Sequence, residues 1–247
     1  MHYKQQSNGV YILSRDDIEE IAAEKLQEYA PDNLKHPRPL DTRDFLINYL
    51  GLILKYRYIG DFQSDILGLT VMGDIVPIPS YDECLRPTIL EETFGTVLIT
   101  PRLLGKDKHP RRRYTEMHEA AHFMLHKPYF EKCEQQYAAR TNPFASIVVC
   151  RMVELKHMYT RTASDWLEYQ ADALAAAMLM PKTPFITCFR DAIRRYNIRT
   201  QSLYGLPFLD TTRMHKVIYD LSQVFQVSYQ ATKIRLSQLG LLTAPAV

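Results

Sequence analysis

The residues best suited to chemistry form the segment His118-Glu119-Ala120-Ala121-His122. On an α-helix, residues four apart project from one face and are displaced by about 6 Å along the axis. Two imidazoles at this spacing can converge on one tetrahedral metal ion, and Glu119 can act as general base on a water molecule there. The alternative is a pair of surface histidines beside an ordinary helical glutamate. The apolar, uninterrupted stretch that follows His122 favours the metal site.

A zinc enzyme of this kind needs a third protein ligand, and two candidates compete. His126 extends the row of histidines, but two helical turns place it about 12 Å from His118, too far for both rings to reach one ion. We interpret His126 as a packing residue, a neighbour of the ligands or a solvated side chain. The other candidate is Glu168, on a second predicted helix. Asp172, one turn beyond Glu168, is placed to accept the ring N–H of a ligating histidine. An exposed acidic pair is the alternative for both carboxylates.

Helices are expected to carry these groups and to fill most of the chain. Residues 15–29 form an amphipathic pattern that Ser14 can cap, and a second helix is expected between Asp41 and Gly51. The helix bearing the histidines should run from about 113 to 127 and stop before Pro128. Ser164 can cap the helix bearing Glu168. Further helices are expected over residues 184–196, 211–225 and 228–239.

Short β-branched and aromatic runs between residues 52 and 99 predict a small sheet, with strands over 52–59, 67–72, 75–78 and 96–99. Residues 144–155 form another strand region. We therefore predict an α+β fold, in which a small sheet packs on the metal-bearing helix. Its parts are an N-terminal helical segment (1–40), a core that carries the candidate metal ligands (41–182) and a helical C-terminal region (183–247).

The composition is that of an ordinary globular protein: of 247 residues, 46% are hydrophobic and 23% charged. The net charge of +2 is too small to imply nucleic acid, acidic substrates or a membrane surface. No apolar run approaches the roughly 20 residues needed to span a bilayer, and the N-terminus lacks a secretory signal. The four cysteines include no Cys-x-x-Cys pair. We expect a cytoplasmic protein with reduced thiols.

Three segments resemble the ImmA/IrrE-type metallopeptidases. Residues 111–126 read Arg-Arg-Arg-Tyr-Thr-Glu-Met-His-Glu-Ala-Ala-His-Phe-Met-Leu-His, similar to Arg-x-Arg-Phe-Thr-Leu-Ala-His-Glu-Leu-Gly-His-x-x-Leu-His in the family. Residues 168–181 read Glu-Tyr-Gln-Ala-Asp-Ala-Leu-Ala-Ala-Ala-Met-Leu-Met-Pro, similar to Glu-x-x-Ala-Asn/Asp-x-Phe-Ala-x-x-Leu-Leu-Met-Pro. The stretch from Phe225-Gln226-Val227-Ser228 to Leu239-Gly240 resembles the ending Phe-x-Val-Ser…Arg-Leu-x-x-Leu-Gly. Ala120 and Ala121 depart from the usual Leu and Gly.

The resemblance implies a minimal zincin fold and zinc-dependent hydrolysis of a peptide bond. It carries over His118, His122 and Glu168 as ligands of one Zn²⁺ per chain and Glu119 as the catalytic base. It also implies a narrow substrate, a separate cytoplasmic helix-turn-helix repressor of a mobile element or a stress response. The insertion over residues 127–164 would control access if it covers the cleft.

Two other functions remain open. A metal that only holds the fold would suit an antirepressor that acts by contact, although the intact Glu119 argues against it. The C-terminal helices have helix-turn-helix spacing, and Lys233 and Arg235 could face DNA, but the excess of basic residues there is small. The basic run over residues 102–113 is interpreted as solvated, with Arg113 packed near the helix start. His157 and Tyr159 are candidates for stabilising an oxyanion and stay outside the predicted site.

Overall fold

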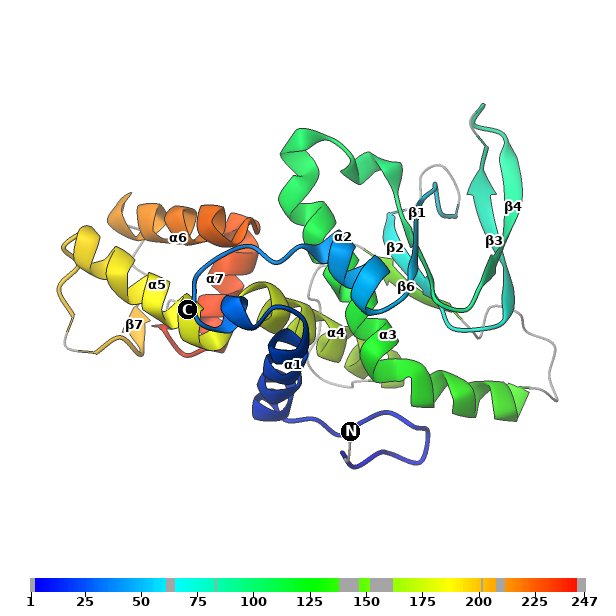
Figure 1. Cartoon of the computed structure of the whole chain (residues 1–247), viewed down its shortest axis with the longest axis horizontal. Coiled ribbons are helices and arrows are strands. Elements are labelled where there is room, and N and C mark those ends of the chain that lie inside the picture. Colours follow the sequence, from blue (N-terminus) through cyan, green and yellow to red (C-terminus); the bar gives the residue numbers. More distant parts are fainter. Residues whose placement is uncertain are drawn as a thin grey trace. The chain divides into compact units, whose positions relative to one another are not determined.

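The fold is mixed α+β, as the sequence predicts (Figure 1). A computed structural model describes residues 3–60, 65–82, 84–137, 147–151, 162–200, 202–207 and 212–243. The chain divides into two compact units, one of Met1–Ile18 with Asp41–Ala175 and one of Glu19–Leu40 with Ala176–Val247. The division into three parts made from the sequence stays a prediction.

A four-stranded sheet forms the centre of the first unit. Its order is β1 (Ile53–Tyr56), β5 (Thr96–Ile99), β2 (Ile66–Val71) and β6 (Ile147–Arg151). Strand β5 runs parallel to β1, whereas β2 is antiparallel to both β5 and β6. Three of these strands fall within stretches predicted from their β-branched and aromatic residues, and β2 begins one residue before the predicted stretch 67–72. Helix α3 (His109–Tyr137) contacts β2 and β5, so the sheet supports the helix that carries the histidines (Figure 1).

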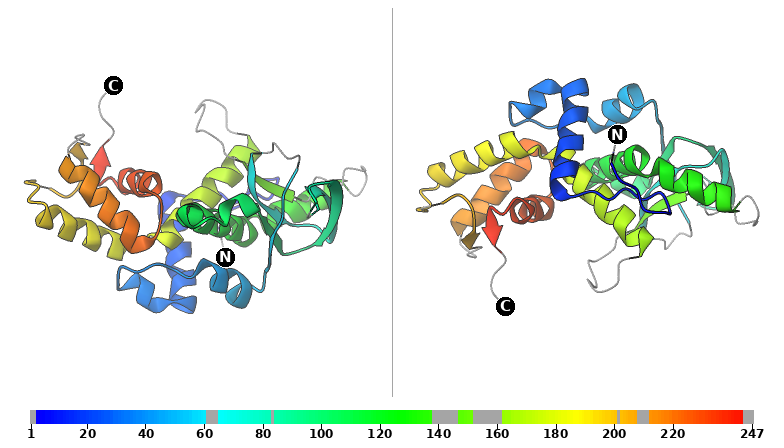
Figure 2. Two further views of the ribbon diagram at one scale, coloured as in Figure 1. Left: turned by 90° about the horizontal axis from the view of Figure 1, so that it is seen from above. Right: turned by 90° about the horizontal axis from the view of Figure 1, so that it is seen from below.

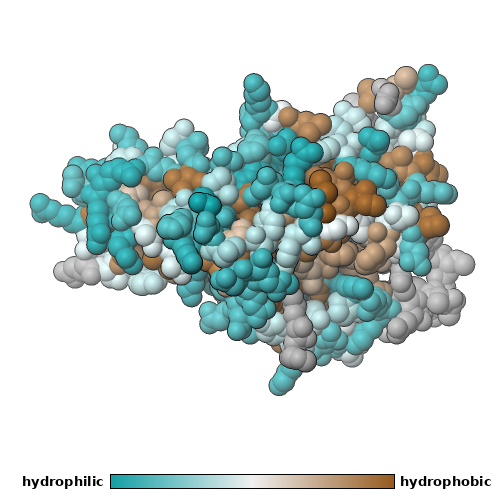
Figure 3. Space-filling model, in the orientation of Figure 1, coloured by the Kyte–Doolittle hydropathy of each residue, from teal (hydrophilic) through white to brown (hydrophobic). Residues whose placement is uncertain are grey.

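A separate hairpin joins β3 (Ile75–Tyr81) to β4 (Pro87–Thr93). Val76 and Ile78 on β3 are buried in one cluster with residues of the central sheet, whereas Ile75 and Ile89 are exposed. Exposed hydrophobic residues also account for brown patches over this unit in Figure 3. The sequence did not predict β4, because its two adjacent glutamates and its proline obscure the alternation. Pairing with β3 along seven residue pairs stabilises β4 as a strand, although its own residues have little β propensity.

Helix α3 (His109–Tyr137) continues through Pro128, so the predicted stop before that residue is wrong. Proline removes one backbone donor from the helix and normally kinks or ends it. Here packing compensates, because Phe130, half a turn later, is buried in a cluster with Val10, Met72 and Leu167. The N-terminal segment also approaches the helix closely. A Cβ on Gly9 (φ +91°) would lie 2.6 Å from the Pro128 carbonyl oxygen.

Helix α4 (Ala163–Leu179) is capped by Thr162, whereas the sequence predicted Ser164. The Asp165 N–H donates to Thr162 Oγ1 at 3.2 Å, and the Thr162 N–H donates to Asp165 Oδ2 at 2.7 Å. This reciprocal pair is a capping box that begins two residues earlier than expected. Both Thr162 and Ser164 are exposed, so burial does not select between them.

Other caps follow the sequence. Ser14 and Asp17 form a capping box at α1 (Arg15–Tyr29), and Asp41 accepts a hydrogen bond from the Asp44 N–H at 3.1 Å. The helix after Asp41 comprises α2 (Thr42–Asp44) and a π-helical turn, η2 (Phe45–Tyr49). Short 3₁₀ turns complete these connections: η1 (Pro31–Leu34), η3 (Pro101–Leu103) and η4 (Lys106–Lys108).

The second unit is mainly helical. It contains α5 (Lys182–Arg195), α6 (Thr212–Phe225), α7 (Tyr229–Gln238) and the short parallel pair β7 (Leu206–Pro207) and β8 (Leu242–Thr243) (Figure 2). Helix α6 contacts both α5 and α7, and Phe185 on α5 packs against Phe225 on α6. These helices lie close to their predicted positions. None of the helices in the described residues has the length and apolar character needed to cross a membrane.

Candidate metal centre

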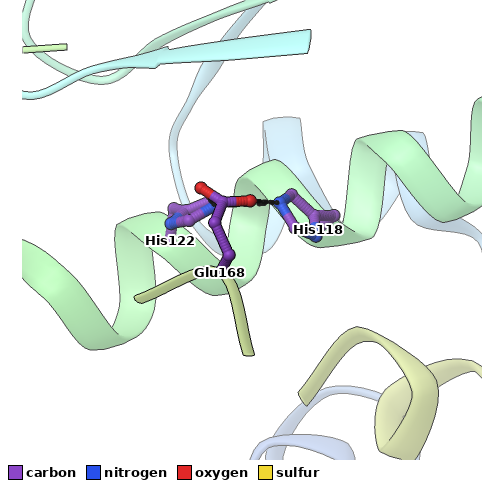
Figure 4. Close-up of side chains that lie close together, drawn as sticks. All are labelled: His118, His122 and Glu168. Carbon is purple, nitrogen blue, oxygen red and sulfur yellow. Dashed lines mark hydrogen bonds and ion pairs between the residues drawn. The ribbon is translucent and has the colours of Figure 1, made fainter. Parts of the chain in front are cut away.

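His118 and His122 of α3 and Glu168 of α4 point toward one another (Figure 4). His118 Nε2 lies 2.9 Å from His122 Nε2 and 3.3 Å from Glu168 Oε2, and His122 Nε2 lies 3.5 Å from Glu168 Oε1. Both histidines are buried, whereas the Glu168 side chain is 31% exposed. The structure therefore brings together the three residues that the sequence predicted as ligands. The four-residue spacing of His118 and His122 places the two rings on one face of α3.

The donor set fits a divalent metal of the zinc type. Tetrahedral bonds of about 2.0–2.1 Å place ligand atoms about 3.3 Å apart, close to the separations observed between these three groups. Asp172 Oδ1 contacts His118 Nδ1 at 2.9 Å, as the sequence predicted. Because a carboxylate only accepts, His118 Nδ1 carries the proton and a neutral His118 ring presents an unprotonated Nε2. Two groups that can offer lone pairs, His118 Nε2 and Glu168, thus face the same point as His122 Nε2.

Glu119 lies beside this cluster and is fully buried. Its Oε2 accepts a hydrogen bond from Thr70 Oγ1 at 2.6 Å, whereas its Oε1 has no hydrogen-bond partner among the described residues. Burial raises the pKa of Glu119 to about 8, and the nearby His118 and the Thr70 hydroxyl partly oppose that shift. An orphaned carboxylate oxygen in a buried site is costly unless a ligand or a water molecule uses it. Glu119 is thus held by one oxygen and free to react through the other.

Strand β2 supplies two residues of this site that the sequence did not predict. Besides its bond to the Glu119 carboxylate, Thr70 Oγ1 lies 3.1 Å from the Glu119 carbonyl oxygen. A Cβ on Gly68 would lie 2.5 Å from Glu119 Oε1, so only glycine lets the strand pass this close to the carboxylate. The sequence indicated that residues 67–72 form a strand but held no information on which helix residue they would face.

His126 lies behind His122, away from the ligand cluster. Its Nδ1 contacts His122 Nδ1 at 2.8 Å, and its Nε2 contacts Gln170 Oε1 at 3.3 Å. Burial lowers the pKa of His126 to about 3 and holds the pKa of His122 well below its ordinary value, so both rings are neutral. Among the alternatives left open for His126, the structure selects a neighbour of a candidate ligand. No pattern in the sequence singles out Gln170.

Arg235 does not form a DNA-facing surface. Its side chain is 2% exposed and donates to the carboxylate of Glu19 and to the Met180 carbonyl oxygen at 3.0 Å. Arg113, which the sequence placed near the helix start, is buried as well. His157 and Tyr159 lie outside the described residues.

Residues 156–237 match the family model described as the IrrE N-terminal-like domain, Peptidase_M78. The match supports an ImmA/IrrE-type family assignment. It covers less than half of the chain and includes Glu168 and Asp172, whereas His118 and His122 precede it. A search of curated proteins found no match. The Peptidase_M78 match supports a peptidase, and the His118–His122–Glu168 cluster fits a metal cofactor.

Proposed function

We propose that this protein is a zinc-dependent peptidase. His118, His122 and Glu168 hold one Zn²⁺ ion, and Glu119 is the general base. The observation that carries the proposal is the convergence of these three side chains beside a buried carboxylate with an unpartnered oxygen. A site that only stabilised the fold would not need a base at that position.

When bound, Zn²⁺ would supply a Lewis acid that polarises the scissile carbonyl and makes water easier to deprotonate. Glu119 accepts the proton of the attacking water on Oε1 and later delivers it to the leaving amine. Thr70 holds the other oxygen and keeps the carboxylate oriented during both transfers. Asp172 holds the His118 ring through Nδ1, so that its Nε2 faces the other ligands.

The substrate in this proposal is a cytoplasmic helix-turn-helix repressor of a mobile element or a stress response. Support comes from the resemblance of three segments to the ImmA/IrrE-type metallopeptidases. In this proposal, the repressor is a polypeptide separate from the peptidase. The burial of Arg235 argues against the alternative in which the C-terminal helices themselves bind DNA.

The variant Glu119→Gln tests the mechanism because it keeps the size of the side chain, removes the base and leaves all three ligands in place. We expect it to bind zinc and the repressor as the wild type does, yet to leave the repressor uncut. The loss of cleavage should be at least about 100-fold, the lower range for removing a general acid–base group. The measurement combines zinc analysis with incubation of a purified candidate helix-turn-helix repressor, followed by mass spectrometry of the products.

Glu131→Gln is the matched control, because Glu131 lies on the same helix but is exposed and forms an ion pair with Lys127. It should cleave at the wild-type rate. In cells, a repressor-controlled reporter and an immunoblot extend the test. Full induction by Glu119→Gln with intact repressor would refute hydrolysis and favour an antirepressor that acts by contact.

A further inference from the structure

A row of hydrogen bonds leads from the N-terminal segment to the candidate ligand His122. The Tyr11 carbonyl oxygen lies 2.7 Å from Gln170 Nε2, and Gln170 Oε1 lies 3.3 Å from His126 Nε2. His126 Nδ1 in turn lies 2.8 Å from His122 Nδ1. Gln170 and His126 are each 1% exposed and His122 is fully buried, so water is excluded from the bonds that His126 forms, whereas the bond to the Tyr11 carbonyl is partly buried. All four residues belong to the first unit.

The Tyr11 carbonyl sets the direction of the first two bonds. A carbonyl oxygen only accepts, so the Gln170 amide must present its NH₂ group to Tyr11 and its oxygen to His126. That oxygen also only accepts, so His126 must carry a proton on Nε2. The amide orientation therefore follows from its partners rather than from the indistinguishable shapes of oxygen and nitrogen.

The same reasoning determines which ring nitrogen of His122 carries the proton. No acidic side chain of the described residues forms a contact with His126, and a charged ring would be costly to bury without a partner. A neutral His126 with its proton on Nε2 has a bare Nδ1, which can only accept. His122 Nδ1 must therefore donate, and its own Nε2 is left with the lone pair that a metal requires.

We propose that Gln170 and His126 are positioning residues. Because the Tyr11 carbonyl only accepts, the hydrogen bonds through these two side chains hold the proton of His122 on Nδ1 and so keep the His122 Nε2 lone pair directed at the metal. This inference rests on the proposed zinc site. Asp172 does the same for His118 from the opposite side, with a charged acceptor in place of a neutral relay. The two Nε2 atoms, 2.9 Å apart, then both present lone pairs, an arrangement that a cation between them stabilises.

The Tyr11 carbonyl, where the row of hydrogen bonds begins, is held in place by the contacts of the N-terminal segment. Tyr11 pairs with Gln5 in an isolated antiparallel bridge, and the Gln6 N–H donates to the Val10 carbonyl oxygen at 2.8 Å. Val10, next to Tyr11, is 1% exposed and packs with Phe130 of α3 and Leu167 of α4. The N-terminal segment is thus anchored on the same two helices that carry the ligands, and the Tyr11 carbonyl is held in place.

Two substitutions of His126 separate positioning from packing. The amide oxygen of His126→Asn can still accept from His122 Nδ1, whereas His126→Leu offers no acceptor. We expect His126→Leu and Gln170→Met to lower zinc affinity by about 10–100-fold, the range for lost partners of ligating histidines. His126→Asn should stay much closer to the wild type. Affinity is measured by competition with a chromogenic chelator, without reference to peptidase activity.

A purely structural role predicts the opposite order, because leucine suits a buried site better than an asparagine with unsatisfied groups. Tyr56→Phe serves as a control for loss of a buried hydrogen bond in the same unit. It removes the 3.0 Å bond to Glu116 Oε1 on α3 and should lower stability with little change in zinc affinity. Equal zinc affinity of His126→Leu and His126→Asn would overturn the relay.

Nitrogen-15 NMR of the histidine rings provides a readout that stability cannot mimic. We expect His122 to be protonated on Nδ1, and His126 to be protonated on Nε2 with a bare Nδ1, in the zinc-free protein. In Gln170→Met, His126 should lose this preference. A proton on His126 Nδ1 in the wild type would overturn the relay. Failure of the wild type to bind zinc would instead overturn the proposed function, while the ring protonation still tests the relay.

Discussion

Three carboxylates of the site differ mainly in their surroundings. Glu119 is fully buried and holds one hydrogen bond, the Glu168 side chain is 31% exposed beside two histidines, and that of Asp172 is 53% exposed against His118 Nδ1. Burial suits a base, because it raises the pKa of Glu119 and so its tendency to take a proton. Glu168, partly exposed and facing two imidazoles, suits the role of a metal ligand. The same chemical group can therefore serve three purposes within two helices.

At this scale, replacing Glu168 and Asp172 should have graded effects. Glu168→Ala removes a ligand atom and should abolish most zinc binding, whereas Asp172→Ala should weaken it by about 10–100-fold because only the support of His118 is lost. Metal analysis after dialysis, with chelator competition for the weaker sites, measures both. A stronger effect of Asp172→Ala than of Glu168→Ala would mean that the third ligand is assigned incorrectly.

At the scale of elements, helices with strong local information were predictable from the sequence. The 3.6-residue pattern and Ser14 located α1 to the residue, because caps and periodicity act within a few positions. Strand β4 and the continuation of α3 past Pro128 were not predictable, because both depend on partners outside the segment itself, β3 in one case and Val10 with Leu167 in the other.

The same division applies to the site. His118, Glu119 and His122 follow from their spacing on one helix, and Glu168 with Asp172 follows from a second helix and the family resemblance. Thr70 and Gly68 do not, because β2 reaches Glu119 only through the packing of the sheet on α3. The relay through Gln170 was equally hidden, since Tyr11 lies 159 residues earlier in the chain.

The cap of α4 offers a test at the element scale. Thr162→Ala removes the hydroxyl that accepts from the Asp165 N–H and should lower the free energy of unfolding by about 1 kcal/mol. Ser164→Ala, two residues on, is the matched control and should change it little. Urea unfolding followed by circular dichroism compares the two. A larger loss for Ser164→Ala would restore the cap predicted from the sequence.

At the scale of the whole molecule, the candidate centre and its supports belong to one compact unit. The three ligands, Glu119, Thr70, Asp172 and the row from Tyr11 to His122 all lie within Met1–Ile18 and Asp41–Ala175. The second unit has its own interior, in which Arg235 pairs with Glu19 and Phe185 packs on Phe225. Metal binding should therefore stabilise the first unit directly.

Removal of zinc tests this localisation. A ligand that binds only the folded form stabilises it by about 2.7 kcal/mol at a hundredfold excess over its dissociation constant. Chelation should thus increase hydrogen exchange in α3, in β2 and in the part of α4 around Glu168, where backbone amides depend on the centre. Amides of α6 and α7 should exchange at unchanged rates and act as the internal control. Hydrogen–deuterium exchange mass spectrometry measures both sets in one sample. Equal loss of protection in α6 and α7 would show that the metal stabilises the chain as a single cooperative body.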